Sequence, residues 1–172
     1  MGLLGFIDEN GKLRVATRYN KTAHFHEDMC AINLKDKWGY IDKGEYLWVQ
    51  PYYDSVMQYQ GGLGAVNKAG KWGFTNKKGE IACKTLYSKV VHQNDGFYAI
   101  QRNNHWGMLN PNGEEFVFTK YDEVAMLGTR FVTVKQGNKY GVCNLKGDLL
   151  TQIEYDNIYF DPVNNTAVAV KK

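Results

Sequence analysis

The chain repeats itself every 34 residues, and this period limits its possible folds more than any other feature of the sequence. One series of the repeat is Gly5, Gly39, Gly73, Gly107 and Gly141. A second series in the same register is Tyr19, Tyr53, Tyr87, Tyr121 and Tyr155. A third is a small residue followed by a β-branched one, as in Ala65-Val66. Three independent series in register indicate tandem copies of one structural element, which bury their apolar faces against each other.

Each repeat is typical of three short strands joined by tight turns. Residues 96–102 alternate like a half-buried strand A, residues 71–75 form a strand B and residues 115–118 a strand C. The turn after strand B begins with Asp or Asn and ends with Gly, as in 76–79, which is typical of a type I turn followed by a residue with positive φ. In the second repeat Gly44 comes one position early, so that turn should differ. The small polar residue after each Tyr should bind its own backbone and end strand C. No helical spacing of apolar residues is present, and the prediction is all-β.

The two ends of the sequence predict how the repeats are arranged. Residues 3–7 read as a strand B without a strand A, and residues 166–170 read as a lone strand A. Unpaired strand edges favour aggregation, and pairing of the last strand with the first would remove both. We therefore expect residues 1–172 to form a single domain of five three-stranded repeats, closed as a propeller-like ring. The alternative is an open β-repeat solenoid, since propeller blades usually have four strands.

Several stretches resemble the WG repeat family, named for its Trp-Gly pair. They are Lys71-Trp72-Gly73-Phe74, Trp38-Gly39-Tyr40-Ile41-Asp42-Lys43 and Pro51-Tyr52-Tyr53-Asp54. The sequence departs from the family pattern where Leu4 and Tyr140 stand in place of Trp. The resemblance implies a β-rich, mostly bacterial binding or interaction module that is often attached to other modules. It implies no catalytic residues that could be carried over to this chain.

Composition excludes several classes of protein. With 44% hydrophobic residues the chain can form a core, and a net charge of +3 is small for a protein that binds nucleic acid specifically. No apolar run approaches the roughly 20 residues of a membrane-spanning helix. The three cysteines are odd in number and widely spaced, which argues against a disulfide framework or a zinc site. A reducing, cytoplasmic compartment is expected.

The candidate ligand-binding residues come from positions next to the Trp-Gly pairs and from the aromatic residues. The position before the pair holds Lys37, Lys71, His105 and Lys139. Around a ring these side chains would focus positive potential on a small anion such as a nucleotide, although lysines there could also simply solvate a rim. Tyr53 and Tyr121 would suit a planar ligand if they lined a cleft, and would otherwise be core residues. The aromatics expected to contact a protein partner are Trp48, Tyr59 and Tyr98. The Trp-Gly pairs themselves are read as structural, with a neighbouring ring or backbone packed on the bare Cα.

Catalytic and metal chemistry have little support in the sequence. His24 and His26 point the same way along an extended segment and are weak candidates for metal ligands, but no third ligand is placed. No nucleophile–base arrangement and no phosphate-binding glycine loop is recognisable. We expect a non-enzymatic binding module without a cofactor, whose partner is a protein. The alternatives are sequestration of a small anion and a metal-assisted hydrolase that uses residues 24–28.

Overall fold

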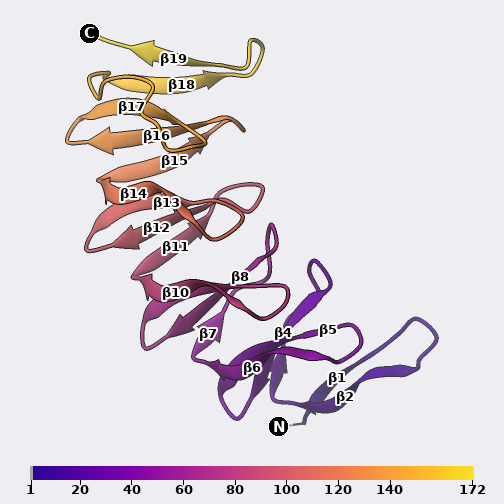
Figure 1. Cartoon of the computed structure of the whole chain (residues 1–172). Helices are drawn as coiled ribbons and strands as arrows, with labels where there is room; N and C mark the ends of the chain where they lie inside the picture. Colours follow the sequence, from indigo (N-terminus) through magenta and orange to yellow (C-terminus); the bar gives the residue numbers. More distant parts are fainter. Residues whose placement is uncertain (1) are drawn as a thin grey trace. The chain divides into compact units, whose positions relative to one another are not determined.

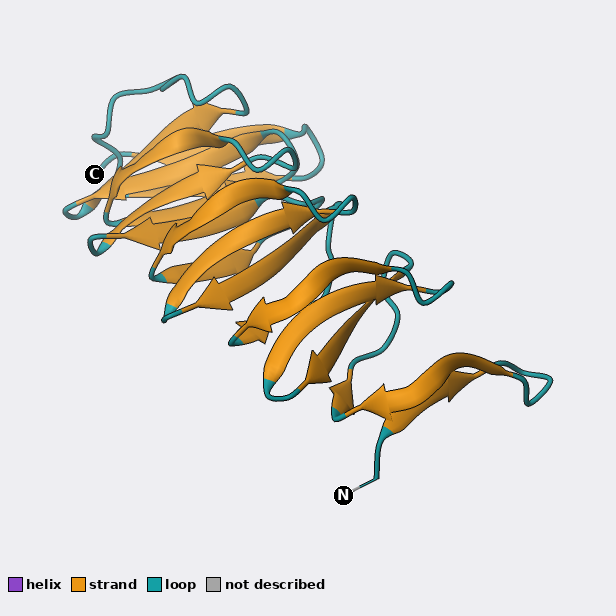
Figure 2. Ribbon diagram, turned by 60° about the horizontal axis from the view of Figure 1, so that its bottom comes forward, coloured by secondary structure: helices purple, strands orange, loops and turns teal. Residues whose placement is uncertain are grey.

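The structure is a computed structural model that describes residues 2–172, and this part of the chain contains strands and turns but no helix (Figure 2). The all-β prediction is confirmed. Accordingly, no helix in residues 2–172 is long and apolar enough to cross a membrane. The contacts divide the chain into two compact units, which we call the N-terminal unit, ending at Leu86, and the C-terminal unit, beginning at Tyr87.

The N-terminal unit is built from one two-stranded and two four-stranded antiparallel sheets (Figure 1). The two-stranded sheet consists of β1 (Leu4–Ile7) and β2 (Leu13–Tyr19). The next sheet consists of β3 (Lys21–Thr22), β4 (Met29–Leu34), β5 (Lys37–Asp42) and β6 (Leu47–Tyr53). The third consists of β7 (Ser55–Val56), β8 (Leu63–Lys68), β9 (Lys71–Asn76) and β10 (Ile81–Tyr87). In the four-stranded sheets the strands are neighbours in chain order.

The C-terminal unit continues the same pattern with one sheet each of four, three and two strands. The four-stranded sheet consists of β11 (Lys89–His92), β12 (Tyr98–Arg102), β13 (His105–Leu109) and β14 (Glu115–Tyr121). The three-stranded sheet consists of β15 (Glu123–Leu127), β16 (Phe131–Gln136) and β17 (Lys139–Asn144). The last sheet consists of β18 (Asn157–Asp161) and β19 (Thr166–Val170).

The prediction of three strands per repeat is wrong, because a further strand follows each repeat tyrosine. This strand is as short as two residues in β3 and β7, too short to show an alternating pattern. Strand C does end at the tyrosine, as predicted, in β2, β6, β10 and β14. The polar residue that follows does not bind its own backbone, however, so that part of the prediction is wrong. The Asp54 N–H donates to the carbonyl of Asn67, and the Asp54 carboxylate accepts the N–H of Ala69 at 2.7 Å. The polar residue therefore ties the new strand to the turn between strands A and B.

The predicted turns are confirmed in detail. Gly79 has φ of +75°, and the Asn76 side-chain oxygen accepts the N–H groups of Lys78 and Glu80, each at 3.0 Å. In the second repeat the corresponding turn does differ, since Glu45 holds the left-handed position with φ of +65°. A non-glycine residue in that conformation is uncommon and carries backbone strain.

The expected pairing of the last strand with the first is not observed in the described residues. β1 pairs with β2, β19 pairs with β18, and each of these two sheets has two strands. The expectation rested on a lone strand A at 166–170 without a hairpin partner. That premise is wrong, because β18 is the strand that follows Tyr155 and it supplies the partner.

The Trp-Gly glycines occupy places where the chain has no room for a side chain. A Cβ on Gly73 would lie 2.6 Å from the carbonyl oxygen of Cys83 and 2.7 Å from the backbone of Lys84. A Cβ on Gly107 would meet the backbone of β14 in the same way. The structural interpretation of the pair is confirmed, with strand C backbone as the neighbour. Strand A is also more deeply buried than expected, since five of the six residues of β8 are buried.

Candidate functional site

The predicted basic positions of the N-terminal unit differ from each other in their surroundings. The Lys37 ammonium lies 2.6 Å from an Asp54 carboxylate oxygen. The ion pair with Lys37, together with the hydrogen bond from Ala69, holds the pKa of Asp54 below its ordinary value. Lys71 is exposed at the start of β9. Lys37 is therefore a structural partner of the residue after the repeat tyrosine.

In the C-terminal unit, too, one of the two predicted basic positions is paired with a carboxylate and the other is exposed. Lys139 lies 2.7 Å from Asp156, which is again the residue after a repeat tyrosine, and His105 is exposed. Of the four predicted basic positions, Lys37 and Lys139 are thus paired with carboxylates, and a role of the series in binding an anion stays a prediction. The Lys–Asp pair, 17 residues apart in both units, fastens strand B to the segment that follows strand C.

Most of the aromatic candidates belong to the core. Tyr53 and Tyr121 are buried within apolar clusters, as core residues would be. Tyr59 and Tyr98, expected to be exposed contacts for a partner, are each only 1% exposed, and that prediction is wrong. The Tyr59 hydroxyl donates to the carbonyl of Asn76 at 2.8 Å, which satisfies its polar end in the core. Trp48 is half-buried.

The His24–Asp28 segment serves the packing of the fold. His24 is exposed, and the Nδ1 atom of His26 lies 2.6 Å from the carbonyl oxygen of Tyr59. The Glu27 carboxylate accepts the N–H groups of Gly61 and Gly62 at 2.6 and 2.9 Å. Partial burial acts to raise the pKa of Glu27, but these two hydrogen bonds and Lys77 outweigh it and lower the pKa. Within residues 2–172, His, Cys, Asp and Glu side chains form no group of three or more suited to a metal ion.

A pocket of about 470 Å³ lies in the N-terminal unit, where β1 and β2 face the loop that leads into β4. Its lining consists of Phe6, Ile7, Asp8, Arg14, Val15, Phe25 and Lys43. We call it the Arg14 pocket. The rings of Phe6 and Phe25 meet edge to face with their centroids 5.0 Å apart, and Val15 is buried below the surface of β2. These residues give the pocket an apolar floor.

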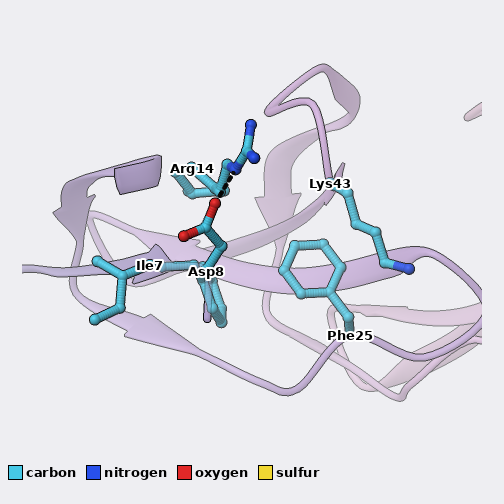
Figure 3. Close-up of a pocket in the computed structure, with 7 residues that line it drawn as sticks. Ile7, Asp8, Arg14, Phe25 and Lys43 are labelled. Carbon is cyan, nitrogen blue, oxygen red and sulfur yellow. Dashed lines mark hydrogen bonds and ion pairs between the residues drawn. The ribbon is translucent and has the colours of Figure 1, made fainter. Parts of the chain in front are cut away.

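Charged side chains surround this floor. The Nε atom of Arg14 donates to Asp8 at 2.7 Å, and Lys43 pairs with Asp28, also at 2.7 Å. In Figure 3 the Asp8–Arg14 pair and Lys43 lie on either side of the Phe25 ring. The N–H of Lys12 and the Arg14 guanidinium lower the pKa of Asp8, so this carboxylate is ionised at neutral pH. Since Arg14 uses its Nε atom for Asp8, its terminal N–H groups remain to meet an anion.

Comparison with the next repeat explains why this space is open. Positions 34 residues later hold Tyr40, Trp48 and Tyr59 in place of Phe6, Arg14 and Phe25. There the two tyrosine rings are 4.7 Å apart, and the Trp48 indole N–H donates to Asp42 at 2.9 Å. The hydrogen bond to the aspartate is therefore kept in both repeats, but an indole ring fills the space in one and an extended guanidinium leaves it open in the other.

Glu45 stands where the later turn has Gly79. A Cβ on Gly79 would overlap the backbone carbonyl of Trp48, so that turn lies directly against strand C. Glu45 carries a Cβ, which requires more distance between its turn and β2. Its carboxylate bridges this distance by accepting the N–H of Ala16 at 3.2 Å and pairing with Arg18 at 2.7 Å.

Arg14 and the other residues that line this pocket are not among the predicted site residues. Arg14 and Glu45 were visible as departures from the repeat, because an arginine aligns with a tryptophan and a glutamate with a glycine. Departures of that kind are the signal that could have located the site. The predicted series instead followed positions that the repeats share. Of these, Lys37 and Lys139 form ion pairs within the fold, and Tyr53 and Tyr121 lie in the core.

The folded chain is thus an all-β repeat protein with a pocket where one repeat departs from the others. The family model described as "WG containing repeat" matches residues 5–38, 38–72 and 140–172, and the chain belongs to this family. The resemblance seen in the Trp-Gly motifs is thereby confirmed. A comparison with curated proteins found no match.

Proposed function

We propose that this protein is a non-enzymatic binding module whose Arg14 pocket takes a small organic anion with an apolar body. The observation that supports this most strongly is the combination of an apolar floor of Phe6, Val15 and Phe25 with cationic groups at its rim. The volume of about 470 Å³ falls within the range of ordinary small-molecule sites. An aromatic carboxylate would bury its ring on the floor and place its charge at Arg14. The lining offers two cations and one carboxylate, which suits a single negative charge better than the phosphates of a nucleotide.

Several groups that could perform catalysis have structural surroundings. Burial raises the pKa of the Cys30 thiol to about 11 and raises that of Cys143, so neither is a ready nucleophile at neutral pH. Glu27 and Asp28, the carboxylates of the candidate hydrolase segment, hold a turn and Lys43 respectively. These contacts favour the binding role over the hydrolase alternative.

The test uses three probes that separate the apolar and charged parts of the ligand. Naphthalene-2-carboxylate has both parts, naphthalene-2-carboxamide lacks the charge and inorganic phosphate lacks the apolar body. Binding is followed by amide chemical shifts in NMR titrations. We expect only the carboxylate to shift the amides of β1, β2 and residues 23–27. Its affinity should also fall with added salt, since partly exposed charges are screened.

Two substitutions at one position separate loss of charge from loss of space. Arg14→Gln should weaken binding of the carboxylate about tenfold or more, because a hydrogen bond to a charged group is removed. Arg14→Trp reproduces Trp48 and should fill the pocket, abolishing binding while retaining a hydrogen bond to Asp8. Arg130→Gln removes an exposed arginine in the C-terminal unit and is the control. Carboxylate binding that survives Arg14→Trp would refute the proposal.

We further infer that the repeats form an open array, without closure through the terminal strands. The pairing of β18 with β19 supports this arrangement, because it gives the last strand A a partner from its own repeat. The deletion experiment in the Discussion tests it.

A further inference from the structure

A second groove of the N-terminal unit combines exposed apolar side chains with positive charge. It has a volume of about 430 Å³ and lies over β6, β8 and β10. The lining consists of Tyr52, Tyr53, Val66, Lys68, Ile81, Cys83, Lys84, Thr85 and Leu86. We call it the Tyr52 groove. It shares no residue with the Arg14 pocket.

The apolar part of the groove is open to solvent. Tyr52 is 57% exposed, Ile81 58% and Leu86 45%, and all three line the same groove. Single exposed apolar residues are ordinary on protein surfaces, whereas a contiguous group of them marks an interaction site. Tyr53 and Val66 are buried and form the floor of the groove. Exposed tyrosine and aliphatic side chains above a packed floor can bind the anchor side chains of a partner.

The charge of the groove has one sign. Lys68 and Lys84 line it, and its lining contains no carboxylate. The Lys68 ammonium lies 3.0 Å from the centroid of the Tyr52 ring, so the cation and the ring are held together as one amphipathic surface. The carboxylates adjacent in sequence have other partners, since Asp54 pairs with Lys37 and Glu80 accepts the side-chain N–H of Asn76.

We propose that the Tyr52 groove binds an acidic peptide segment of a partner protein through one or two of the segment's aromatic or aliphatic side chains. The apolar anchors would lie on Tyr52, Ile81 and Leu86, and flanking carboxylates would meet Lys68 and Lys84. A peptide fits this surface better than a small anion, because its contacts extend over three strands and combine several apolar anchors with two separate cations. Charge complementarity of this kind selects the partner and accelerates its association. This site goes beyond the proposed function of the Arg14 pocket and does not depend on it.

The test compares three synthetic peptides that differ in one property at a time. The first, acetyl-DEWEDLE-amide, is acidic and carries two apolar anchors. The second, acetyl-NQWQNLQ-amide, keeps the anchors without the charge, and the third, acetyl-DEAEDAE-amide, keeps the charge without the anchors. Affinity is measured by fluorescence anisotropy of labelled peptides with the full chain. We expect the first peptide to bind about tenfold or more tightly than either of the others.

Variants locate the binding on the protein. Lys68→Glu combined with Lys84→Glu should reduce affinity for the first peptide about tenfold or more, because two attractive contacts become repulsive. Lys12→Glu combined with Lys146→Glu makes the same change in net charge outside the groove, and this control should bind as the unsubstituted chain does. Ile81→Ser should weaken binding without unfolding the protein, since the side chain is exposed.

Cys83 provides a readout at the groove itself. It lines the groove, whereas Cys30 and Cys143 are fully buried, so bound peptide should slow the alkylation of Cys83. Arg14→Trp should leave peptide binding unchanged, which separates this proposal from that of the Arg14 pocket. Equal affinity for the three peptides, or unchanged binding by the Lys68/Lys84 variant, would overturn it. Self-association of the unsubstituted chain would also overturn it if the Lys68/Lys84 substitutions abolished that self-association. The groove would then be occupied by a second copy of the chain.

Discussion

Substitution of Gly107 by alanine tests whether the Trp-Gly pair is an architectural device. A Cβ at this position would lie 2.8 Å from the Thr119 nitrogen and 2.9 Å from the Phe118 carbonyl carbon, and closer still to the Val117 carbonyl oxygen. Ordinary van der Waals contacts of a Cβ begin near 3.4 Å. All three atoms are backbone, so relief requires β13 and β14 to move apart where their register is already irregular.

The size of the effect follows from these contacts. Overpacking of this kind costs about 1–3 kcal/mol, and a strained ladder hydrogen bond costs roughly 1 kcal/mol more. Alanine also lowers the conformational entropy of the unfolded chain relative to glycine, and this raises the free energy of unfolding by about 0.4–1 kcal/mol. We therefore expect Gly107→Ala to lower the free energy of unfolding by about 2 kcal/mol.

The same repeat position in β17 provides the control. A Cβ on Gly141 would lie 3.0 Å from Ile153 Cγ1, and its other near neighbours are 3.4 Å away. A side chain can yield where a backbone cannot, so Gly141→Ala should change the free energy of unfolding by less than about 1 kcal/mol. Urea unfolding followed by circular dichroism measures both variants, and hydrogen exchange locates the loss in β13 and β14. Equal effects at the two glycines would refute the reasoning.

Two further predictions follow from the strand pairing and the ion pairs. Deletion of residues 166–172 removes β19, and hydrogen exchange should quicken in β18 but stay unchanged in β1; faster exchange in β1 would indicate closure through the terminal strands. Lys37→Glu should lower the melting temperature more than Lys71→Glu, because it places a carboxylate beside Asp54, whereas Lys71 is exposed with no carboxylate partner among the contacts described for residues 2–172. Equal melting temperatures of the two lysine variants would contradict the structural role of the pair.

The period and the turns could be predicted because each depends on local chemistry. Four residues of sequence are enough to recognise the turn at 76–79. Its first residue, Asn76, accepts a backbone N–H within the turn, and its last, Gly79, has a positive φ. The strand after the tyrosine was missed in β3 and β7 because two residues carry no pattern. Its pairing, as in Thr22 with Ile32, depends on a strand that comes later in the chain. The burial of Tyr59 was missed for a related reason. Its hydroxyl finds its partner 17 residues away, and only the folded sheet brings the two together.

The Arg14 pocket shows how a repeat protein can acquire a site without losing its fold. Repeats bury the same positions in every copy, so a cavity forms where one copy loses the side chain that fills the space. Arginine at position 14 keeps the hydrogen bond to aspartate that Trp48 makes in the next copy, at 2.7 Å against 2.9 Å, and so keeps the local backbone geometry. The arginine lacks the volume of the indole ring and adds a positive charge. Glu45 joins its turn to β2 by accepting the N–H of Ala16 and pairing with Arg18. The departure at position 14 thus accounts for the open space and for a cation in the pocket, whereas shared positions such as Tyr53 and Tyr121 lie in the core.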